Sequence, residues 1–251
     1  MLLPVDPAFG AVLAVLLAVA AAVCAFARLR PPREVVLAGL RAALQLAAVS
    51  LVIGWVVGAV PLLLLFLLLM YGVAVRTAGR RVTGNRPWWW AAAPIAAGVG
   101  PVVAALLLTG LVPPRGITLV PVVGILVGGA LTATVLAGRR ALDELASRRG
   151  EVEAGLALGL AERDARLEVA RRAAADALLP GRDQTRTVGV VTLPGAFVGM
   201  LLGGASPWQA GAVQLFVLVG LMAVQAVAVA VVLELVARGR LHRQEPGGAA
   251  A

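Results

Sequence analysis

The sequence contains no lysine, one cysteine (Cys24) and one histidine (His242). A P-loop needs a lysine that reaches the nucleotide phosphates, so the chain cannot be a P-loop ATPase by itself. The single cysteine and histidine exclude a disulfide framework, a Cys/His zinc site within one chain and histidine-based acid–base chemistry in the membrane. We therefore expect no catalytic residues and no cofactor bound by this chain, so any use of ATP requires a partner subunit.

Charged residues are also scarce, at 14% of the 251 residues, whereas 61% are hydrophobic and the mean hydropathy is +0.94. A soluble domain has roughly a quarter of its residues charged. Several apolar runs reach the length of about 20 residues that crosses the hydrocarbon core of a bilayer. Because lipid leaves backbone polar groups no external partner, these runs must be helices. The sequence predicts an all-α integral membrane protein.

About seven spans are predicted, with the N-terminus outside and the whole chain forming one transmembrane domain. The spans are approximately 9–27, 36–57, 61–75, 88–112, 117–138, 187–203 and 211–237. This topology places 20 of the 22 arginines on the cytoplasmic side, in the loops 28–35, 76–87 and 139–186 and the basic, low-complexity tail 238–251, as the positive-inside rule requires. The expected location is the bacterial cytoplasmic (inner) membrane.

Two alternatives arise from these features. The first span could instead be a cleaved or lipidated leader, because Ala25-Phe26-Ala27 imitates a cleavage site and Cys24 precedes it. Positive charge follows this segment and does not precede it, which favours a retained anchor. The net charge of +9 could indicate a nucleic-acid partner. The arginines outside 139–186 lie mostly at helix ends and form no patch, so we expect a bilayer and no nucleic acid.

The segment 139–186 carries ten arginines and nine acidic residues in a helix-favouring sequence with weakly amphipathic spacing. It lies between predicted spans five and six, so we expect a helical excursion on the cytoplasmic side. Two interpretations are open: a solvated hairpin that lies on the membrane, or a docking element for a soluble protein.

Polar residues within the spans are candidates for a transport pathway. Arg41 and Gln45 share one helix face, and Arg41 either serves a pathway or extends to the headgroups. Gln214 and Gln225 also share a face and either line a pathway or form interhelical hydrogen bonds. The remaining candidates lie around predicted span six: Asp183, Arg186, Thr187, Leu193, Pro194 and Gly195.

Each of these remaining candidates has a structural alternative. Asp183 and Arg186 form either part of the pathway and its coupling or an ordinary helix-start cap and ion pair. Leu193-Pro194-Gly195 should break or kink the helix, which either lines a cavity or is a packing kink. The Glu234 carboxylate is expected to pair with Arg238 at the inner end of the last span.

The run Glu153-Ala154-Gly155-Leu156-Ala157-Leu158-Gly159 resembles the cytoplasmic Glu-Ala-Ala…Gly loop by which ABC-transporter permeases contact their ATPase subunits. Gly155 stands where that loop has its second alanine, and Leu179-Pro180 resembles its end. The resemblance implies that Glu153, Ala154, Gly159, Leu179 and Pro180 couple the chain to an ATPase.

Four further segments resemble the FetB-type permease family, which includes bacterial iron-export permeases and plant aluminium-tolerance relatives. They are Arg41–Leu46, Val120–Ile125, Asp183–Gly195 and Ser206–Ala210. One departure is Gly128-Gly129-Ala130, where the family usually has an asparagine after the second glycine.

This resemblance implies a permease that works with a separate P-loop ATPase subunit, as two permeases and two ATPases, and exports iron or another metal. The metal-binding residues are unknown, because Cys24, Met70, Met200 and Met222 are scattered; a chelated metal or an organic solute fits the spans equally well. The rivals are an ATP-independent carrier or channel and a non-transport membrane scaffold.

Overall fold

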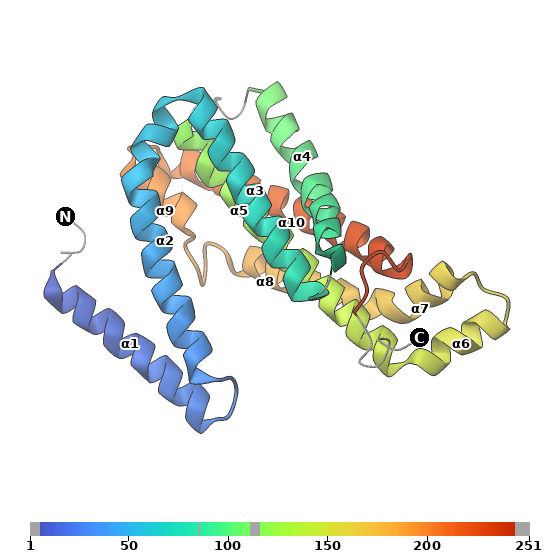
Figure 1. The fold of residues 1–251 in the computed structure, drawn as a ribbon. Helices are drawn as coiled ribbons and strands as arrows, with labels where there is room; N and C mark the ends of the chain where they lie inside the picture. Colours follow the sequence, from blue (N-terminus) through green and yellow to red (C-terminus); the bar gives the residue numbers. More distant parts are fainter. Residues whose placement is uncertain (1–5, 85, 111–115, 244–251) are drawn as a thin grey trace. The chain divides into compact units, whose positions relative to one another are not determined.

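The computed structural model describes residues 6–84, 86–110 and 116–243, and these residues form helices joined by turns, with no β-strand among them (Figure 1). The all-α fold class predicted from the sequence is therefore confirmed. The chain divides into two compact units, Met1–Ala59 and Val60–Ala251.

The first unit is a pair of helices, α1 (Pro7–Phe26) and α2 (Pro32–Gly58). The Asp6 carboxylate accepts a hydrogen bond from the Phe9 backbone N–H at 2.9 Å and so caps the start of α1. The two helices approach closely where a Cβ atom on Gly39 would lie 2.8 Å from Cδ1 of Leu17. Arg41 and Gln45 lie on an exposed part of α2.

The second unit is built on the long helices α3 (Val60–Val82), α4 (Ala92–Leu108), α5 (Gly116–Ser147) and α10 (Pro207–Ala237), with a 3-10 turn, η1 (Arg86–Ala91), before α4. Glycines allow these helices to approach closely. A Cβ atom on Gly98 would lie 2.7 Å from the Val224 carbonyl oxygen, which joins α4 to α10. Gly129 lies against Leu221, and Gly138 lies against Val232, so α5 and α10 run side by side in the same direction.

The remaining elements come from the charged excursion and the segment after it. They are α6 (Arg149–Ala157), α7 (Glu162–Ala175), η2 (Asp176–Leu178), α8 (Leu179–Thr187) and α9 (Gly195–Leu202). No helix boundary falls at the predicted span limit of residue 138, because α5 continues to Ser147. The residues after 138 are good helix formers without glycine or proline, so nothing interrupts the backbone hydrogen bonds.

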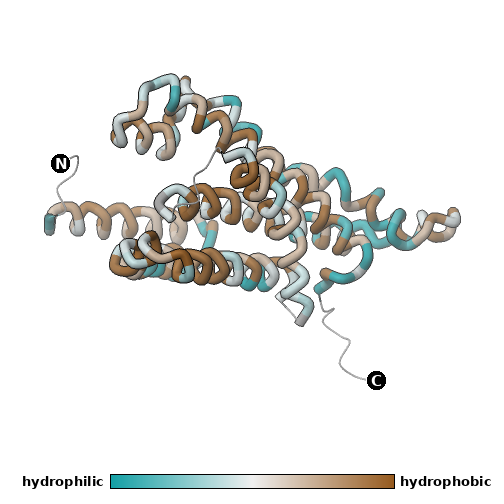
Figure 2. The backbone as a smooth tube through the Cα atoms, turned by 90° about the horizontal axis from the view of Figure 1, so that it is seen from above, coloured by the Kyte–Doolittle hydropathy of each residue, from teal (hydrophilic) through white to brown (hydrophobic). Residues whose placement is uncertain are grey.

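Six helices in the described part of the chain are long and apolar enough to cross a membrane, and most of their length is hydrophobic in Figure 2. They are Pro7–Phe26, Pro32–Gly58, Val60–Val82, Pro87–Leu108, Thr118–Ser147 and Pro207–Ala237. Each corresponds to one predicted span.

The predicted span 187–203 differs, because it is not one helix. The helix α8 ends at Thr187, and α9 begins only at Gly195 and has eight residues. Eight residues are about 12 Å of helix, too short to cross a bilayer alone. Two local features explain the break: Gly189 has a φ of +82°, and Pro194 disfavours helical backbone at Leu193.

Candidate functional site

The helices α6 and α7 form a hairpin that follows the end of α5 and contains the Glu-Ala-Ala-like segment (Figure 1). The turn is closed by a Schellman motif. The Gly159 N–H donates to the Leu156 carbonyl at 2.9 Å, and the Leu160 N–H donates to the Gly155 carbonyl at 3.1 Å. This motif needs left-handed backbone, and Gly159 supplies it with a φ of +88°. Gly159 therefore has a structural role in ending α6.

The hairpin is closely packed at Gly155. A Cβ atom there would lie 3.1 Å from Cβ of Ala165 in α7 and 3.4 Å from Cδ1 of Leu160. Both distances are tighter than ordinary van der Waals contact, so a glycine at this position lets α6 and α7 come together. The two helices are therefore closely packed against each other at this point.

Three leucines are exposed at the tip of this hairpin. Leu158 is 86% exposed, and Leu156 and Leu160 are 41% and 46% exposed. The element is otherwise charged and lies outside the six candidate spans, so these side chains do not belong to a membrane-crossing helix. An exposed apolar cluster rimmed by charges is typical of a protein-docking surface.

The residues predicted to couple to an ATPase lie in two places. Glu153 is exposed in α6 and pairs with Arg149 at 3.4 Å, and the Ala154 carbonyl accepts the Leu158 N–H at 3.1 Å. Leu179 and Pro180 lie in the first turn of α8, which packs against η2 and α10. The structure thus brings Glu153, Ala154 and Gly159 together in one element and places the other two in another.

The turn geometry predicts a difference between two glycines of this hairpin. Gly159→Ala should cost about 1 kcal/mol, because an alanine at this φ is strained. Gly150→Ala should be neutral or slightly stabilising, because a Cβ atom on Gly150 meets nothing within 4 Å and alanine favours helix over glycine. Hydrogen exchange of the α6 and α7 amides should rise about fivefold in the first variant only. Equal exchange in both variants would contradict the assigned turn.

Arg148 organises the corner between α5 and α6. It donates to Glu144 at 2.9 Å and to Glu151 through two guanidinium nitrogens. These hydrogen bonds raise the pKa of Arg148 above its usual value and lower the pKa of the Glu151 carboxyl. A polar cleft of about 470 Å³ lies beside this corner, between it and α7, and its charged lining is Arg148, Glu151, Glu168, Arg171 and Arg172.

The second candidate region is the broken segment, comprising α8, residues 188–194 and α9. Its depth is set by the contact between α8 and α10, where a Cβ atom on Gly181 would lie 2.1 Å from Oε1 of Gln225. Gln225 lies about 18 Å along α10 from Ala237. The α8 end of the broken segment therefore lies in the apolar part of the unit. The helix α9 also packs against α10.

The backbone of residues 188–194 is partly paired within the segment. The Thr187 carbonyl accepts the Val191 N–H at 2.9 Å, and the Gly189 N–H donates to the Thr192 carbonyl at 2.8 Å. Pro194 starts α9 without a side-chain cap, and Val190 is 92% exposed. Non-helical backbone at membrane depth is tolerated only where protein covers it or where it lines a water-filled cavity. This requirement makes the broken segment the best candidate for a pathway.

Asp183, Arg186 and Thr187 all lie on α8. The carboxylate and guanidinium are 4.0 Å apart, and their side chains are 66% and 70% exposed, so they form a loose ion pair. Of the structural alternative, the ion pair is present, but the two residues do not cap a helix start, because α8 begins at Leu179. The Thr187 hydroxyl donates to the Asp183 carbonyl at 3.0 Å. Leu193 is 62% exposed and lies just before the Pro194–Gly195 start of α9.

Gln214 and Gln225 are buried in α10, with 5% and 8% of their surface exposed. Oε1 of Gln214 has no hydrogen-bond partner within the described part of the chain, so the expected interhelical bond is not made by this atom. A buried acceptor without a partner costs about 1–3 kcal/mol. Gln225 lies where α8 crosses α10, and its Nε2 lies 3.6 Å from a Cβ position on Gly129.

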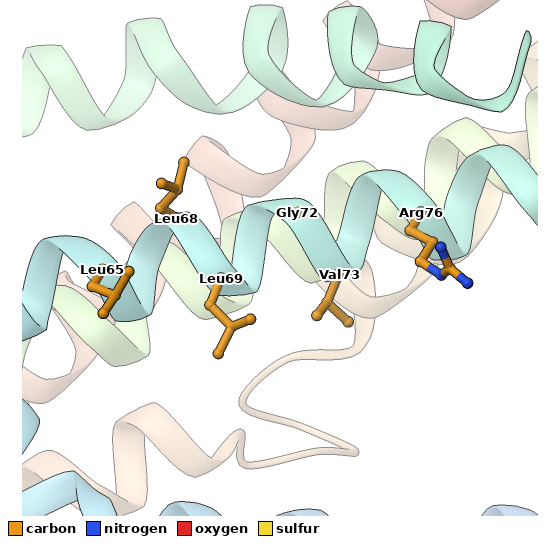
Figure 3. A pocket seen from close by; sticks show the side chains of 6 residues that line it. All are labelled: Leu65, Leu68, Leu69, Gly72, Val73 and Arg76. Carbon is orange, nitrogen blue, oxygen red and sulfur yellow. The ribbon is translucent and has the colours of Figure 1, made fainter.

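A shallow groove on α3 contains none of the predicted site residues. Its volume is about 360 Å³, and its lining is apolar apart from Arg76 (Figure 3). The lining residues are Leu65, Leu68, Leu69, Gly72, Val73 and Arg76. A groove of this kind suits contact with lipid or another helix better than binding of a polar solute. In the residues that the structure describes, no group of three or more His, Cys, Asp or Glu side chains comes together to hold a metal ion.

One ion-pair network was missed by sequence reasoning. The expected pair between Glu234 and Arg238 is present, and Arg163 of α7 binds the same carboxylate through Nε at 2.6 Å and Nη2 at 2.8 Å. Arg163 and Glu234 are 71 positions apart in the sequence. No local spacing signals such a contact, because it depends on how α7 folds back onto α10.

These features define an all-α membrane protein with several apolar helices and one charged helical hairpin between them. The Uncharacterised protein family (UPF0014) matches residues 10–240, and the chain belongs to this family.

Two plant proteins and one bacterial protein illustrate the relationship. The chain is 36% identical to the UPF0014 membrane protein STAR2 of Oryza sativa subsp. japonica, over 75% of the chain and 67% of that protein. It is 34% identical to Protein ALUMINUM SENSITIVE 3 of Arabidopsis thaliana, over 71% and 66%. It is 29% identical to the Probable iron export permease protein FetB of Escherichia coli (strain K12), over 49% and 48%. The matches thus span about two thirds of each plant protein. No solved structure matches the chain.

Proposed function

We propose that this chain is the permease subunit of an ABC transporter that exports iron or another metal, driven by a separate P-loop ATPase subunit. The observation that carries the proposal is the exposed leucine cluster on the α6–α7 hairpin. It lies in the segment whose sequence resembles the ATPase-contacting loop of ABC permeases. A charged hairpin with an exposed apolar tip can bind a soluble subunit, because buried apolar residues supply much of the affinity at protein interfaces.

The chain supplies the pathway and the ATPase supplies the energy. The broken segment and the buried amides of Gln214 and Gln225 are the pathway candidates, together with Arg41 and Gln45 of the first unit. Asp183, Arg186 and Thr187 lie on α8, between the hairpin and the break, and serve gating or coupling. ATP acts through the partner, and this chain binds no cofactor of its own.

The assembly that we propose contains two permeases and two ATPases in the bacterial cytoplasmic membrane, with the N-terminus outside. The six apolar helices support a multi-pass protein. The arginine distribution supports a hairpin on the cytoplasmic side, where ATP and ATPase subunits are found. The cargo assignment is supported by one relative that is named a probable iron export permease and another that is named for aluminium sensitivity.

Cargo is tested by the metal content of cells with and without the chain. Cells that lack it should accumulate iron, or another single metal, after loading with that metal, and wild-type chain should restore the normal content. Element analysis after separate loading with iron, manganese, zinc and aluminium identifies the metal. Unchanged content for all four would contradict metal export and leave the permease assignment standing.

An ATP-independent carrier is the second candidate, because the broken segment also favours it. Carriers of that class form their binding sites from discontinuous helices near the membrane midplane. The two candidates differ in the role of the hairpin tip. Loss of the apolar surface at the tip should leave transport by a carrier unchanged but should reduce transport by an ATP-driven permease.

A further inference from the structure

The hairpin is tied to the inner end of α10 by a two-pronged contact. Arg163, near the start of α7, donates from Nε and Nη2 to the two carboxylate oxygens of Glu234, at 2.6 and 2.8 Å. Bidentate pairs of this kind fix orientation as well as distance, because the planar guanidinium matches the carboxylate. The hydrogen bonds that Arg163 donates to the Glu234 carboxylate raise the pKa of Arg163 above its usual value.

A second contact lies one turn further along α7. Nη1 of Arg166 donates to the Ala237 carbonyl at 3.4 Å and would lie 3.1 Å from a Cβ atom on Gly239. Gly239 has a φ of +69° and ends α10 in a Schellman turn. A cation at the last carbonyls of a helix interacts favourably with the helix dipole. Two arginines of α7 therefore hold the end of α10.

The packing beneath these contacts is made largely of small side chains. The buried face of α7 and η2 includes four alanines, Ala165, Ala170, Ala174 and Ala177. Alanines permit close approach, and the larger side chains buried on α7 are Leu167 and Val169. The Arg163–Glu234 pair adds a directional polar contact that helps to fix the register of α7 on α10.

The helix α10 extends from this contact to the broken segment. It has 31 residues, about 46 Å of continuous helix, and it meets α8 at the Gln225–Gly181 contact. The two helices of the hairpin pack closely where Gly155 faces Ala165. The helix α7 contacts both α5 and α10, so a displacement of the hairpin tip can reach α10 through α7, and α8 through α10.

We propose that the Arg163–Glu234 pair is the joint that transmits movement of the α6–α7 hairpin to α10 and thereby to the broken segment. The inference rests on the proposed function, since an ATPase must supply the movement. Arg163 and Glu234 are positioning residues that contact no cargo. Arg163 follows the hairpin tip closely in the sequence, so bound ATPase must be measured separately from transport to distinguish transmission from docking.

The chain offers a clean substitution and a matched control. Arg163→Ala removes the joint and leaves Glu234 paired with Arg238; it also removes the exposed pairing of Arg163 with the neighbouring Asp164. Arg238→Ala removes the other arginine from the same carboxylate and leaves the joint intact. Arg163→Lys keeps the charge but loses the fork, because a lysine is a point donor.

The first measurement concerns register alone and needs neither cargo nor ATPase. Cys24 is the single cysteine, so Cys24→Ser gives a background for spin labels at Glu168→Cys in α7 and Ala226→Cys in α10, both exposed sites. The distance distribution between these labels should be narrow in this background and with Arg238→Ala. It should broaden with Arg163→Ala and lie between these extremes with Arg163→Lys. An unchanged distance distribution in Arg163→Ala would contradict the proposal that this pair fixes the register of α7 on α10.

The second measurement concerns transmission. The chain and its ATPase are reconstituted in proteoliposomes, and iron(II) transport, ATP hydrolysis and bound ATPase are measured together. In Arg163→Ala the bound ATPase should stay within twofold of wild type, while iron moved per ATP hydrolysed falls about tenfold. Arg238→Ala should change that ratio less than twofold.

Two results would overturn the inference in different ways. Loss of the bound ATPase in Arg163→Ala would show that the pair builds the docking surface and does not transmit movement. An unchanged ratio with the ATPase bound would show that movement reaches α10 by another route. A wild-type chain that binds no ATPase would overturn the proposed function and, with it, the role of the joint. The wild-type sample by itself distinguishes this outcome from the other two.

Discussion

Replacing Leu158 with glutamate should remove the ATPase subunit from the chain. Leu158 is 86% exposed at the hairpin tip, and its burial in a partner would contribute roughly 2 kcal/mol. A carboxylate at this position forfeits that contribution and adds a desolvation cost, so the affinity should fall at least about thirtyfold. The measurement is the ratio of ATPase to permease after purification of the tagged variant in mild detergent.

Leu108→Glu is the matched control for this experiment. Leu108 is 87% exposed and ends α4, just as Leu158 lies at the end of α6, but Leu108 lies within the predicted span 88–112, near the outer end of that span. The control should retain the wild-type ratio. Equal retention of ATPase by both variants would show that the hairpin tip is not part of the docking surface. Equal loss from both would indicate general damage and contradict a tip-specific contact.

Gly79→Ala should destabilise the second unit strongly. A Cβ atom at this position would lie 2.0 Å from the Trp88 carbonyl oxygen and 2.6 Å from its carbonyl carbon, and these are backbone atoms that cannot rotate away. Overpacking against side chains already costs about 1–3 kcal/mol, and displacement of η1 adds to this cost. We expect the thermal unfolding midpoint in detergent to fall by roughly 5–10 °C.

Gly72→Ala tests whether this effect is specific. Gly72 lies on the same helix, but a Cβ atom there meets nothing within 4 Å. Because alanine favours helix over glycine by about 1 kcal/mol, this variant should melt at or slightly above the wild-type temperature. A similar loss in both variants would contradict the close approach of α3 to η1.

The apolar helices could be predicted from the sequence because membrane spans obey a simple rule of length and composition. Six predicted segments each coincide with a helix of sufficient length and hydropathy. The exception, 187–203, satisfied the composition rule and still broke, because Gly189 and Pro194 act on local backbone geometry that hydropathy does not report. The helix α5 continues past residue 138 for the same reason. The sequence becomes charged there, but its residues still favour helical backbone.

The candidate site was predictable only where it is local. The Glu153–Gly159 segment was recognisable from its residues, and the Glu234–Arg238 pair from helical spacing. The structural role of Gly159 needed its φ angle, and the pairing of Arg163 with Glu234 needed the tertiary fold. The contact of Gly181 with Gln225 could not be predicted either, because it joins two helices whose packing the sequence does not specify.

We propose that ATP hydrolysis by a separate subunit drives transport through this chain. The most direct measurement is iron uptake into inside-out proteoliposomes that contain the chain with or without its co-purified ATPase. Uptake should require both the ATPase and hydrolysable ATP, and it should vanish with a non-hydrolysable analogue. Uptake by the chain alone, at the same rate without ATP, would contradict the claim and establish an ATP-independent carrier.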